Sequence, residues 1–330
     1  MFCLKRNNIR HLSAEKRQYF LIFECFIDTN NAYLLMLRAY YLGCPVWANK
    51  EWCGTLFSRR AKSPDYLRQY ARVFNSVEGS ATFYSLPAAD MLLRWKHETP
   101  ESFRFMFKFP RLITHDYLLK NMERETLHFL QTMQPLQSRI GLLFLQLPPT
   151  FGPKMLPALA KYLPLLPPDY RYAVEVRHRD FFTSDTHAQH LDDLLAQHHI
   201  NRTVFDTIAL HQLDGADPMT REAQRKKPKM PTYFAATAQQ PVIRYVGHQL
   251  PENNTERLQL IAQYTAEWII QGKTPYIFLH SPGDLYAPQI CRHFHSLLTQ
   301  LLAPQGIDIG QLPPFIGEAE ADQATQTQLF

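Results

Sequence analysis

Charged and polar residues that could do chemistry stand at the ends of several apolar segments. The segment YAVEVRH, residues 172–178, is an apolar strand that gains Glu175, Arg177 and His178 at its carboxyl end. A buried strand cannot keep an unpaired carboxylate or guanidinium, so these groups must pair or line a cavity. The same pattern recurs in six other apolar segments, at Glu78, Lys108, Gln146, Asp206, Arg244 and His280. Polar groups at successive strand ends predict the C-terminal mouth of a β/α barrel.

Three of these residues suggest catalytic roles. Side chains alternate along a strand, so Glu175 and Arg177 share one face while His178 lies on the other. Glu175 is predicted to be a general base or a metal ligand, and Arg177 a clamp for an oxyanion or a phosphate. Lys108 could supply a point charge for an anion or a Schiff-base amine. The structural alternatives are an internal ion pair and a lysine that extends to solvent at the rim.

Histidines and further carboxylates extend the candidate set. His115, in the loop after the third predicted strand, and His178 are candidate proton carriers, since histidine titrates near neutrality. Five residues could together form an oxygen and nitrogen site for a hard divalent cation: Glu78, Glu175, His178, Asp206 and His280. The lysine and the two arginines at the same rim would repel a metal ion. The cofactor is therefore left open.

Other residues are candidates for binding a substrate. Trp47 and Tyr84, in loops after the first two strands, could stack on a base or sugar ring, although they could equally pack the loops themselves. Arg225, Lys226 and Lys227, in the segment after the sixth strand, could contact a phosphate backbone or form a solvated patch. The predicted substrate-binding set also includes Gln146, Arg244 and His280.

The elements that must position these residues alternate between strands and helices. Eight apolar segments predict strands: YLGCPVW, NSVEG, FRFMFK, LLFLQ, YAVEV, RTVFD, PVIRYV and TPYIFLH. Helical patterns lie between them, near residues 63–74, 87–97, 122–134, 153–166, 187–199, 255–271 and 286–302. This order predicts an α/β fold, a single TIM-type (β/α)8 barrel over residues 38–304. A doubly wound open sheet is the competing topology.

The remaining segments are predicted to lie outside the barrel core. Residues 1–37 lack convincing periodicity and are predicted to be an N-terminal extension. Residues 207–240 are predicted to be an elaborated loop over the mouth. Residues 305–330 are rich in Pro, Gly, Gln and acidic residues, which predicts a flexible tail.

Composition narrows the function classes. The 330 residues carry a net charge of +5, which suits a phosphate-bearing ligand but does not require one. The five cysteines contain no C-x-x-C pair, which argues against a disulfide framework or a zinc site and favours the cytoplasm. No stretch is long and apolar enough to predict a membrane helix. No glycine-rich nucleotide-binding motif follows any predicted strand.

Residues 326–330, QTQLF, resemble the Q-x-x-L-F peptide by which bacterial DNA polymerases and repair proteins dock on the sliding clamp. In such a peptide Leu329 and Phe330 would be the apolar anchors and Gln326 the polar contact. The resemblance implies a protein partner at DNA, although a five-residue pattern also arises by chance.

Longer blocks carry a resemblance to a family. The stretches VFNSVEGSATFYSLP, RWKHETPESFRFMFKFP, LLFLQLPPTFGP and VEVRHRDFF, in this order, resemble the YecE-like proteins, also called the domain of unknown function 72 family. The resemblance implies a TIM-type barrel and does not supply a reaction. The opening of this chain, GCPVW at residues 43–47, departs from the family's G-T-S-G-W, so a role for hydroxyl groups in the first loop is not expected here.

The sequence leads to one preferred hypothesis and two alternatives. The preferred hypothesis is a cytoplasmic barrel protein that binds or processes a phosphate-containing substrate, such as nucleic acid, at the mouth; as an enzyme it would be a hydrolase of phosphate esters. One alternative is an isomerase, lyase or hydrolase that acts on a sugar-like or carboxylated metabolite. The other is a non-catalytic adaptor. A barrel fold is compatible with all three.

Overall fold

A computed structural model of the chain describes residues 39–212 and 217–327, with side chains as far as residue 321. The extension predicted for residues 1–37 lies outside the described residues. The described residues from Tyr40 onward form one compact unit, which contains the barrel.

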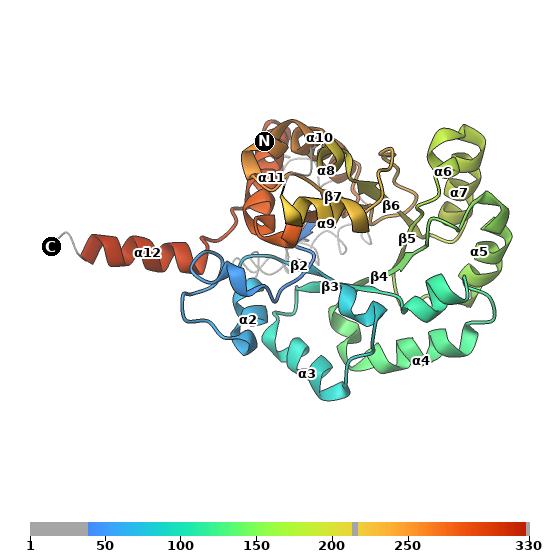
Figure 1. Cartoon of the computed structure of the whole chain (residues 1–330), viewed down its shortest axis with the longest axis horizontal. Coiled ribbons are helices and arrows are strands. Elements are labelled where there is room, and N and C mark those ends of the chain that lie inside the picture. The colour runs from blue at the N-terminus through green and yellow to red at the C-terminus, as the bar shows by residue number, and fades with distance from the viewer. Residues whose placement is uncertain (1–38, 213–216, 328–330) are drawn as a thin grey trace, which may run out of the picture. The chain divides into compact units, whose positions relative to one another are not determined.

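Eight parallel strands form one sheet in the order β1-β8-β7-β6-β5-β4-β3-β2 (Figure 1). Their bounds are β1 Tyr41–Gly43, β2 Ser76–Gly79, β3 Arg104–Lys108, β4 Ile140–Gln146, β5 Tyr172–Glu175, β6 Asn201–Asp206, β7 Val242–Val246 and β8 Tyr276–His280. The two end strands also approach each other, because the Glu78 amide donates to the Cys44 carbonyl at 3.1 Å. The sheet is therefore a nearly closed barrel, and the predicted TIM-like α/β fold is confirmed.

Glycine makes the seam between β1 and β2 possible. A Cβ at Gly43 would lie 2.0 Å from the backbone oxygen of Ser76, which no side chain tolerates. The seam matters for the site because Glu78 follows Ser76 on β2.

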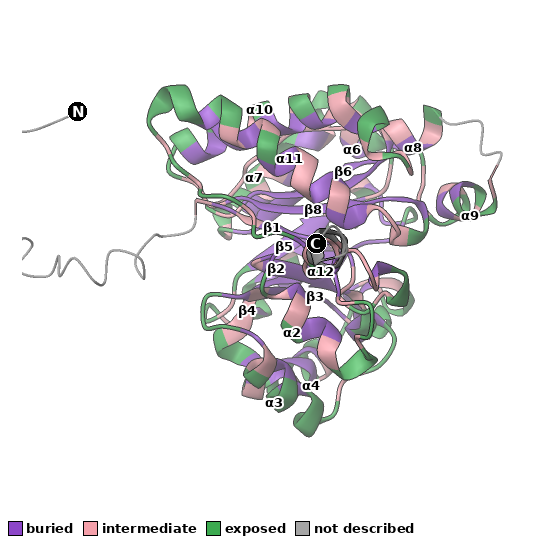
Figure 2. Cartoon of the chain, turned by 90° about the vertical axis from the view of Figure 1, so that its left-hand side faces the viewer, coloured by how far each residue is buried: buried purple, intermediate pink, exposed green. Residues whose placement is uncertain are grey.

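Helices cover the outside of the barrel close to the predicted ranges. They are α2 Tyr66–Tyr70, α3 Ala89–Glu98, α4 Glu123–Met133, α5 Leu156–Tyr162, α6 Asp180–Thr183, α7 Asp185–Gln197, α10 Thr255–Ile270 and α11 Ala287–Leu302. Short turns lie between them: η2 Lys50–Trp52, η3 Ser63–Asp65, η4 Ser80–Phe83, η5 Leu112–Asp116, η6 Gln134–Arg139, η7 Pro153–Met155, η8 Leu163–Leu165, η9 Pro251–Asn254, η10 Pro282–Asp284 and η11 Ala303–Gln305. The strands are buried and the helices expose their outer faces (Figure 2). None of the helices in the described part of the chain is long and apolar enough to cross a membrane.

The barrel interior is apolar in its middle and polar at the carboxyl ends of the strands. Its apolar layer consists of Met106, Leu142, Phe144, Ala173, Val242, Tyr276 and Phe278. Side chains two residues apart on a strand point to the same face, so the next inward residue after each of five members is polar: Lys108, Gln146, Glu175, Arg244 and His280. The strands therefore bring the predicted polar residues to one end of the barrel.

Two helices follow β6 where the sequence predicted an elaborated loop. They are α8 Ile208–Gln212 and α9 Pro218–Lys226. Buried Leu210 and Ala223, one from each helix, pack with Phe205 and Val246 at the carboxyl ends of β6 and β7. The segment thus covers part of the mouth, as its predicted position implied.

The segment after residue 305 differs from the predicted flexible tail. It contains helix α12, Ile316–Thr327, which begins against the loop after β1 and then runs away from the barrel (Figure 1). Phe315 is fully buried beneath the guanidinium of Arg292, whose Cζ lies 3.4 Å from the ring centroid. The Gly317 amide donates to the Thr55 carbonyl at 2.8 Å. One aromatic anchor and a few backbone hydrogen bonds fix the start of α12, and a polar composition does not reveal them.

Candidate functional site

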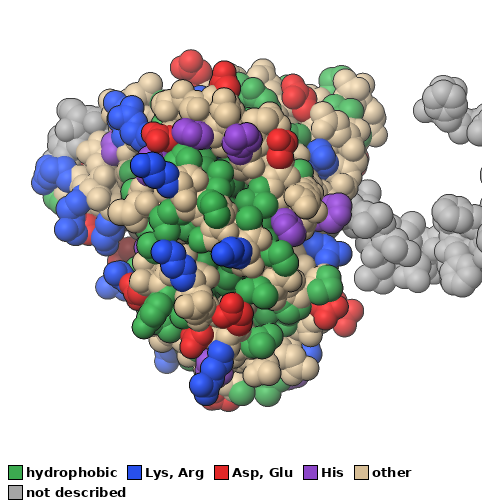
Figure 3. Space-filling model, turned by 90° about the vertical axis from the view of Figure 1, so that its right-hand side faces the viewer, with side chains coloured by type: hydrophobic (Ala, Val, Ile, Leu, Met, Phe, Trp, Pro, Cys, Tyr) green, Lys and Arg blue, Asp and Glu red, His purple; other side chains and the backbone are tan. Residues whose placement is uncertain are grey.

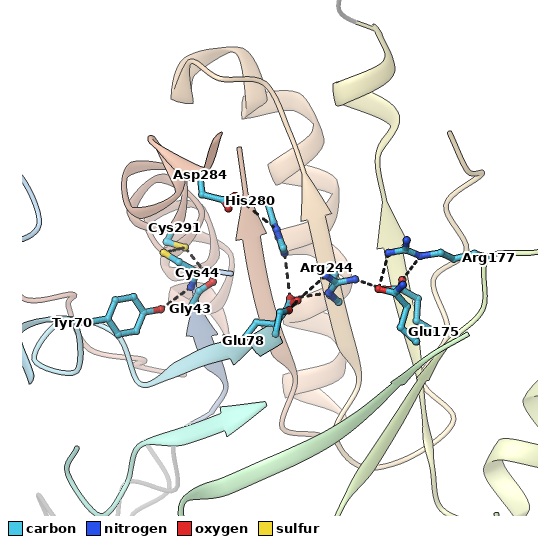
Figure 4. Close-up of polar contacts among 12 residues, drawn as sticks. Gly43, Cys44, Tyr70, Glu78, Glu175, Arg177, Arg244, His280, Asp284 and Cys291 are labelled. Atoms are coloured by element: carbon cyan, nitrogen blue, oxygen red, sulfur yellow. Dashed lines mark hydrogen bonds and ion pairs between the residues drawn. The ribbon is translucent and has the colours of Figure 1, made fainter. Parts of the chain in front are cut away.

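Arg244 connects two buried carboxylates across the barrel interior (Figure 4). Its guanidinium donates two hydrogen bonds of 2.8 Å to Glu78 and one of 2.5 Å to Glu175. Glu78 is 2% exposed and Glu175 is fully buried. Because these residues come from β2, β5 and β7, the contacts tie widely separated strands together.

Arg177 extends this network toward β4. Its Nε donates to Glu175 at 2.6 Å and its Nη2 donates to the Gln146 side-chain oxygen at 3.0 Å. Its guanidinium also lies over the ring of Phe205, with Cζ 4.5 Å from the centroid. Phe205 was not among the predicted residues. The sequence signal for it is its place one residue before Asp206, on the opposite face of the strand.

His280 and two loop residues extend the network on the other side of Glu78. His280 Nε2 lies 3.3 Å from Glu78 Oε2, and His280 Nδ1 lies 3.9 Å from Asp284 Oδ1. The Ser80 hydroxyl donates to Glu78 at 2.8 Å. Sequence reasoning missed Ser80 and Asp284, which come shortly after β2 and β8 and therefore lie at the same end of the barrel.

The network keeps both carboxylates ionised. Burial alone would raise the pKa of Glu78, but Arg244 and His280 outweigh it and hold that pKa well below its usual range. The pKa of Glu175 is likewise lowered, since Arg177 and Arg244 outweigh its burial. Both oxygens of Glu175 accept hydrogen bonds from arginines. This arrangement contradicts the general-base role predicted for Glu175, which instead holds the two guanidinium groups in place.

Lys108 lies at the same end of the barrel without a carboxylate partner among the described residues. Its Nζ lies 3.7 Å from the centroid of the Phe83 ring, and the residue is 9% exposed. Burial, followed by the charges of Arg244 and Arg177, lowers the pKa of Lys108 to about 7. The amine therefore exchanges its proton close to neutral pH, which suits proton transfer as well as anion binding.

His115 does not behave as the proton carrier that the sequence predicted. Burial, followed by the positive charges of Lys108 and Arg177, lowers the pKa of His115 to about 4. Its Nδ1 forms a hydrogen bond of 2.9 Å with the Thr114 hydroxyl. A neutral imidazole at pH 7 can donate or accept a hydrogen bond here, but it does not gain and lose a proton near neutrality.

Two further predicted catalytic residues lie elsewhere. Asp206 pairs in register with Tyr245, one position away from the inward pair Phe205 and Arg244, so it points outward and accepts from Arg257 of α10 at 2.5 Å. His178 lies beyond the end of β5, where its Nδ1 accepts from the Asp180 amide at 3.3 Å. The placement of Asp206 in the mouth was wrong, because Asp206 has the opposite strand parity. The role predicted for His178, whose ring lies beside Gly152 in the loop after β4, stays a prediction.

Of the two aromatic residues predicted to contact a ligand, one is packed inside the fold and the other is exposed. Trp47 packs edge-on against Trp95 of α3, with ring centroids 5.1 Å apart, and against Phe105, so it belongs to the layer between strand and helix. Its predicted place at the mouth was therefore wrong. Tyr84, in contrast, is 81% exposed and follows η4. Tyr84 remains available to a ligand.

The three basic residues predicted to contact phosphate differ in their surroundings. Arg225 and Lys226 are exposed on α9 and pair with Glu222 at 2.9 and 2.8 Å. Lys227, immediately after α9, is half-buried, and burial lowers its pKa, opposed by Asp284 and reinforced by Arg244. Lys227 thus joins the mouth electrostatically, while the first two residues form a locally neutralised surface.

The arrangement does not fit the divalent-cation site that the sequence left open. Over residues 39–212 and 217–327, no three His, Cys, Asp or Glu side chains are grouped as metal ligands. The oxygens of Glu78 and Glu175 accept hydrogen bonds from arginines, and Asp206 points away from the mouth toward Arg257. Binding of a partner through residues 326–330 stays a prediction. Leu329 and Phe330 lie outside the described residues, and Gln326 is described only as part of α12.

Comparisons with known proteins agree with the fold. The model of the family described as protein of unknown function DUF72 matches residues 41–308. The UPF0759 protein YecE of Escherichia coli strain K12 is 39% identical over 83% of this chain and 96% of its own length. A crystal structure of a DUF72 family protein from Enterococcus faecalis V583 has a TM-score of 0.62 at 16% identity, and covers 83% of this chain and 98% of that chain. Another, from Thermotoga maritima MSB8, has a TM-score of 0.57 at 19% identity, and covers 80% of this chain and 99% of that chain. The chain therefore belongs to the DUF72 family.

Proposed function

We propose that the mouth of the barrel binds the phosphate group of an anionic substrate. The observation that carries this proposal is Lys108, a nearly buried amine that has no carboxylate partner among the described residues and lies near Arg177. Holding several cations together in a low-dielectric site costs free energy unless an anion joins them. A ligand phosphate would supply that anion.

The balance of charges supports the same proposal. Four cationic residues, Arg177, Arg244, Lys108 and Lys227, influence one another at this end of the barrel. The carboxylates beside them are Glu78, Glu175 and Asp284, and Arg244 occupies the first two. Arg177 keeps donors on Nη1 that no described residue accepts, and a planar guanidinium binds phosphate oxygens in pairs.

A compact phosphate group fits better than a long polyanion. Arg225 and Lys226 are paired with Glu222, which weakens them as contacts for a nucleic-acid backbone. On the face covered by α4, α5 and α7, basic and acidic side chains are interspersed around a hydrophobic middle (Figure 3). We therefore propose a small phosphate ester or the end of a nucleic-acid strand as the substrate.

The geometry is also compatible with hydrolysis of that ester. Arg177 would stabilise charge that develops on the phosphoryl oxygens. Lys108, with a pKa of about 7, would be partly unprotonated at neutral pH, so it could take a proton from the water that attacks phosphorus and return it to the alcohol oxygen that leaves as the P–O bond breaks. A carboxylated metabolite could use the same cations, and an adaptor would bind the anion without turnover.

Calorimetric titration with inorganic phosphate tests the binding. We expect the Arg177→Gln and Lys108→Met variants to bind phosphate at least tenfold more weakly than the unmodified protein. Arg225→Gln is the matched control, because it removes an exposed arginine of α9 that Glu222 already neutralises. Equal affinity in all four proteins, or no binding of phosphate by the unmodified protein, would contradict the proposal.

We also propose that residues 326–330 bind the bacterial sliding clamp. Besides the sequence pattern, the support is the position of α12, which is held at its start and runs away from the barrel (Figure 1). Because α12 runs away from the barrel, its far end could present such a peptide to an apolar groove of a partner.

A further inference from the structure

A groove lies beside the mouth, on the outside of the barrel. Its volume is about 1050 Å³, and it lies among η4, η5 and α4. Its lining includes Thr82, Tyr84, Leu112, Leu127 and His128. The residues of the ion-pair network, Glu78, Glu175, Arg177, Arg244 and His280, do not line it, so the groove is a neighbour of the network and not part of it.

The groove presents an aromatic ring to solvent. Tyr84 is 81% exposed, yet its ring packs edge-to-face on buried Phe83, with centroids 5.0 Å apart and an interplanar angle of 88°. Leu112 and Leu127, exposed by 44% and 50%, add apolar surface nearby. A solvent-facing aromatic ring is the kind of platform on which a nucleobase stacks.

Phe83 connects this groove to the mouth. One contact of its ring is Tyr84, at 5.0 Å, and another is the amine of Lys108, at 3.7 Å. The Tyr84 ring centre and Lys108 Nζ are therefore less than 9 Å apart. Thr82 strengthens the connection, because it lines the groove while its hydroxyl donates to the Lys108 carbonyl at 2.6 Å.

We infer that the substrate carries an aromatic ring as well as a phosphate, and that it is a nucleoside monophosphate. The base would lie in the groove against Tyr84, and the phosphate would reach Lys108 and Arg177 in the mouth. A base and a phosphate joined through one sugar span a separation of this size. His128 and Gln131, on the α4 side of the groove, offer hydrogen-bonding groups for the edge of the base. This inference rests on the proposed function, since it requires the mouth to bind phosphate.

Two ligands, one with a base and one without, distinguish the contribution of the base to binding from that of the phosphate. Calorimetry would compare adenosine 5′-monophosphate with ribose 5-phosphate, which lacks the base. We expect the nucleotide to bind about tenfold more tightly, the size of effect that one base stacked on an aromatic side chain produces. Tyr84→Ala should abolish that difference and leave the affinity for ribose 5-phosphate unchanged, whereas Tyr84→Phe should retain it. The matched control is Tyr117→Ala, since Tyr117 is 54% exposed and does not line the groove.

The outcomes distinguish this inference from the proposal beneath it. Equal binding of the two ligands, or an equal loss of both in Tyr84→Ala, would overturn the inference and leave phosphate binding at the mouth intact. Failure of both ligands to bind would overturn the two together. A single-stranded trinucleotide with a 5′-phosphate adds a further comparison: preferential binding through Tyr84 would still support the inference and would identify the end of a strand as the source of the nucleotide.

Discussion

Arg244 is the residue on which the other charges at the mouth depend. It occupies oxygens of both Glu78 and Glu175, and all three side chains are almost completely buried. A buried ion pair contributes little net stability compared with apolar packing, but the loss of one partner leaves uncompensated charge in the interior. The arrangement is therefore easier to explain as preparation of a binding site than as a source of stability.

Replacing Arg244 should accordingly destabilise the fold. We expect Arg244→Met to lower the free energy of unfolding by about 3–5 kcal/mol, because it leaves two buried carboxylates without a cation. Urea denaturation followed by circular dichroism measures the change. Arg225→Met, on the surface of α9, should change the free energy by less than about 0.5 kcal/mol. A loss in Arg244→Met no larger than in this control would mean that solvent or His280 already compensates the carboxylates.

The shifted pKa of Lys108 predicts how anion binding depends on pH. Sulfate stays a dianion across this range, so a change in its affinity reports the protein. As the pH rises through about 7, Lys108 loses its proton, and we expect sulfate to bind more weakly at pH 8 than at pH 6. Lys108→Met should bind sulfate weakly at both values, with a smaller dependence on pH. An unchanged pH dependence in that variant would assign the titration to another group.

The lowered pKa of Lys108 has the opposite effect on the stability of the fold, which should increase as the pH rises. Between pH 7 and the ordinary lysine value near 10.4, the folded chain holds Lys108 neutral while the unfolded chain binds a proton there. Protons therefore favour unfolding in this window, and the contribution of Lys108 to stability improves as the pH rises. A group that destabilises the fold at neutral pH and strengthens anion binding as it becomes charged fits a functional role.

At the scale of elements, strand parity determines which polar residues reach the mouth. Apolar runs ending in a polar residue were enough to predict Glu78, Lys108, Gln146 and Arg244 at one end of a barrel. The sequence alone could not decide whether Asp206 or its neighbour Phe205 pointed inward, because both faces of a barrel strand are buried and the alternation of polar and apolar residues is lost. The register of β6 against β7 decides it, and register depends on the whole sheet.

Helix α12 was missed for a different reason. Its composition is polar, and its attachment depends on one buried ring, on backbone groups of residues 55 and 56, and on the contacts of Glu318 with Arg292 and of Glu320 with the Arg59 amide. No periodic pattern reports such an attachment. The close approach also requires a glycine, since a Cβ at Gly317 would lie 2.3 Å from the Phe57 carbonyl oxygen.

This packing gives a test of the attachment. We expect Gly317→Val to displace the start of α12, because the new side chain would collide with the backbone of residues 54–57. Hydrogen exchange should become faster at the amides of residues 316–318, which donate to Leu56 and Thr55. Exchange in the barrel strands should not change. Gln311→Val, at an exposed position before the helix, is the control, and slow exchange retained in Gly317→Val would mean that α12 is held by contacts elsewhere.

For the molecule as a whole, the mouth and the α12 attachment use different parts of one barrel. The mouth is built from the carboxyl ends of β2, β3, β4, β5, β7 and β8, whereas the start of α12 contacts the loop after β1 and Arg292 of α11. In the described part of the chain, no hydrogen bond or ion pair joins the network residues to α12. Sites without shared residues usually act independently in their free energies.

Because the two sites share no residues, we expect changes in residues 326–330 to affect clamp binding without changing the phosphate affinity of the mouth. We expect the full chain to bind the bacterial sliding clamp and a version lacking Leu329 and Phe330 not to bind it, since those residues would supply the apolar anchors. Surface plasmon resonance on immobilised clamp measures this, with Gln311→Ala as a control outside the peptide. The affinity of the mouth for phosphate should be the same in both versions. Clamp binding that survives the deletion would remove residues 326–330 from consideration. Clamp binding that depends on them would place a phosphate-binding barrel beside DNA, and 5′-phosphorylated strands and nucleotides would then be the first substrates to assay.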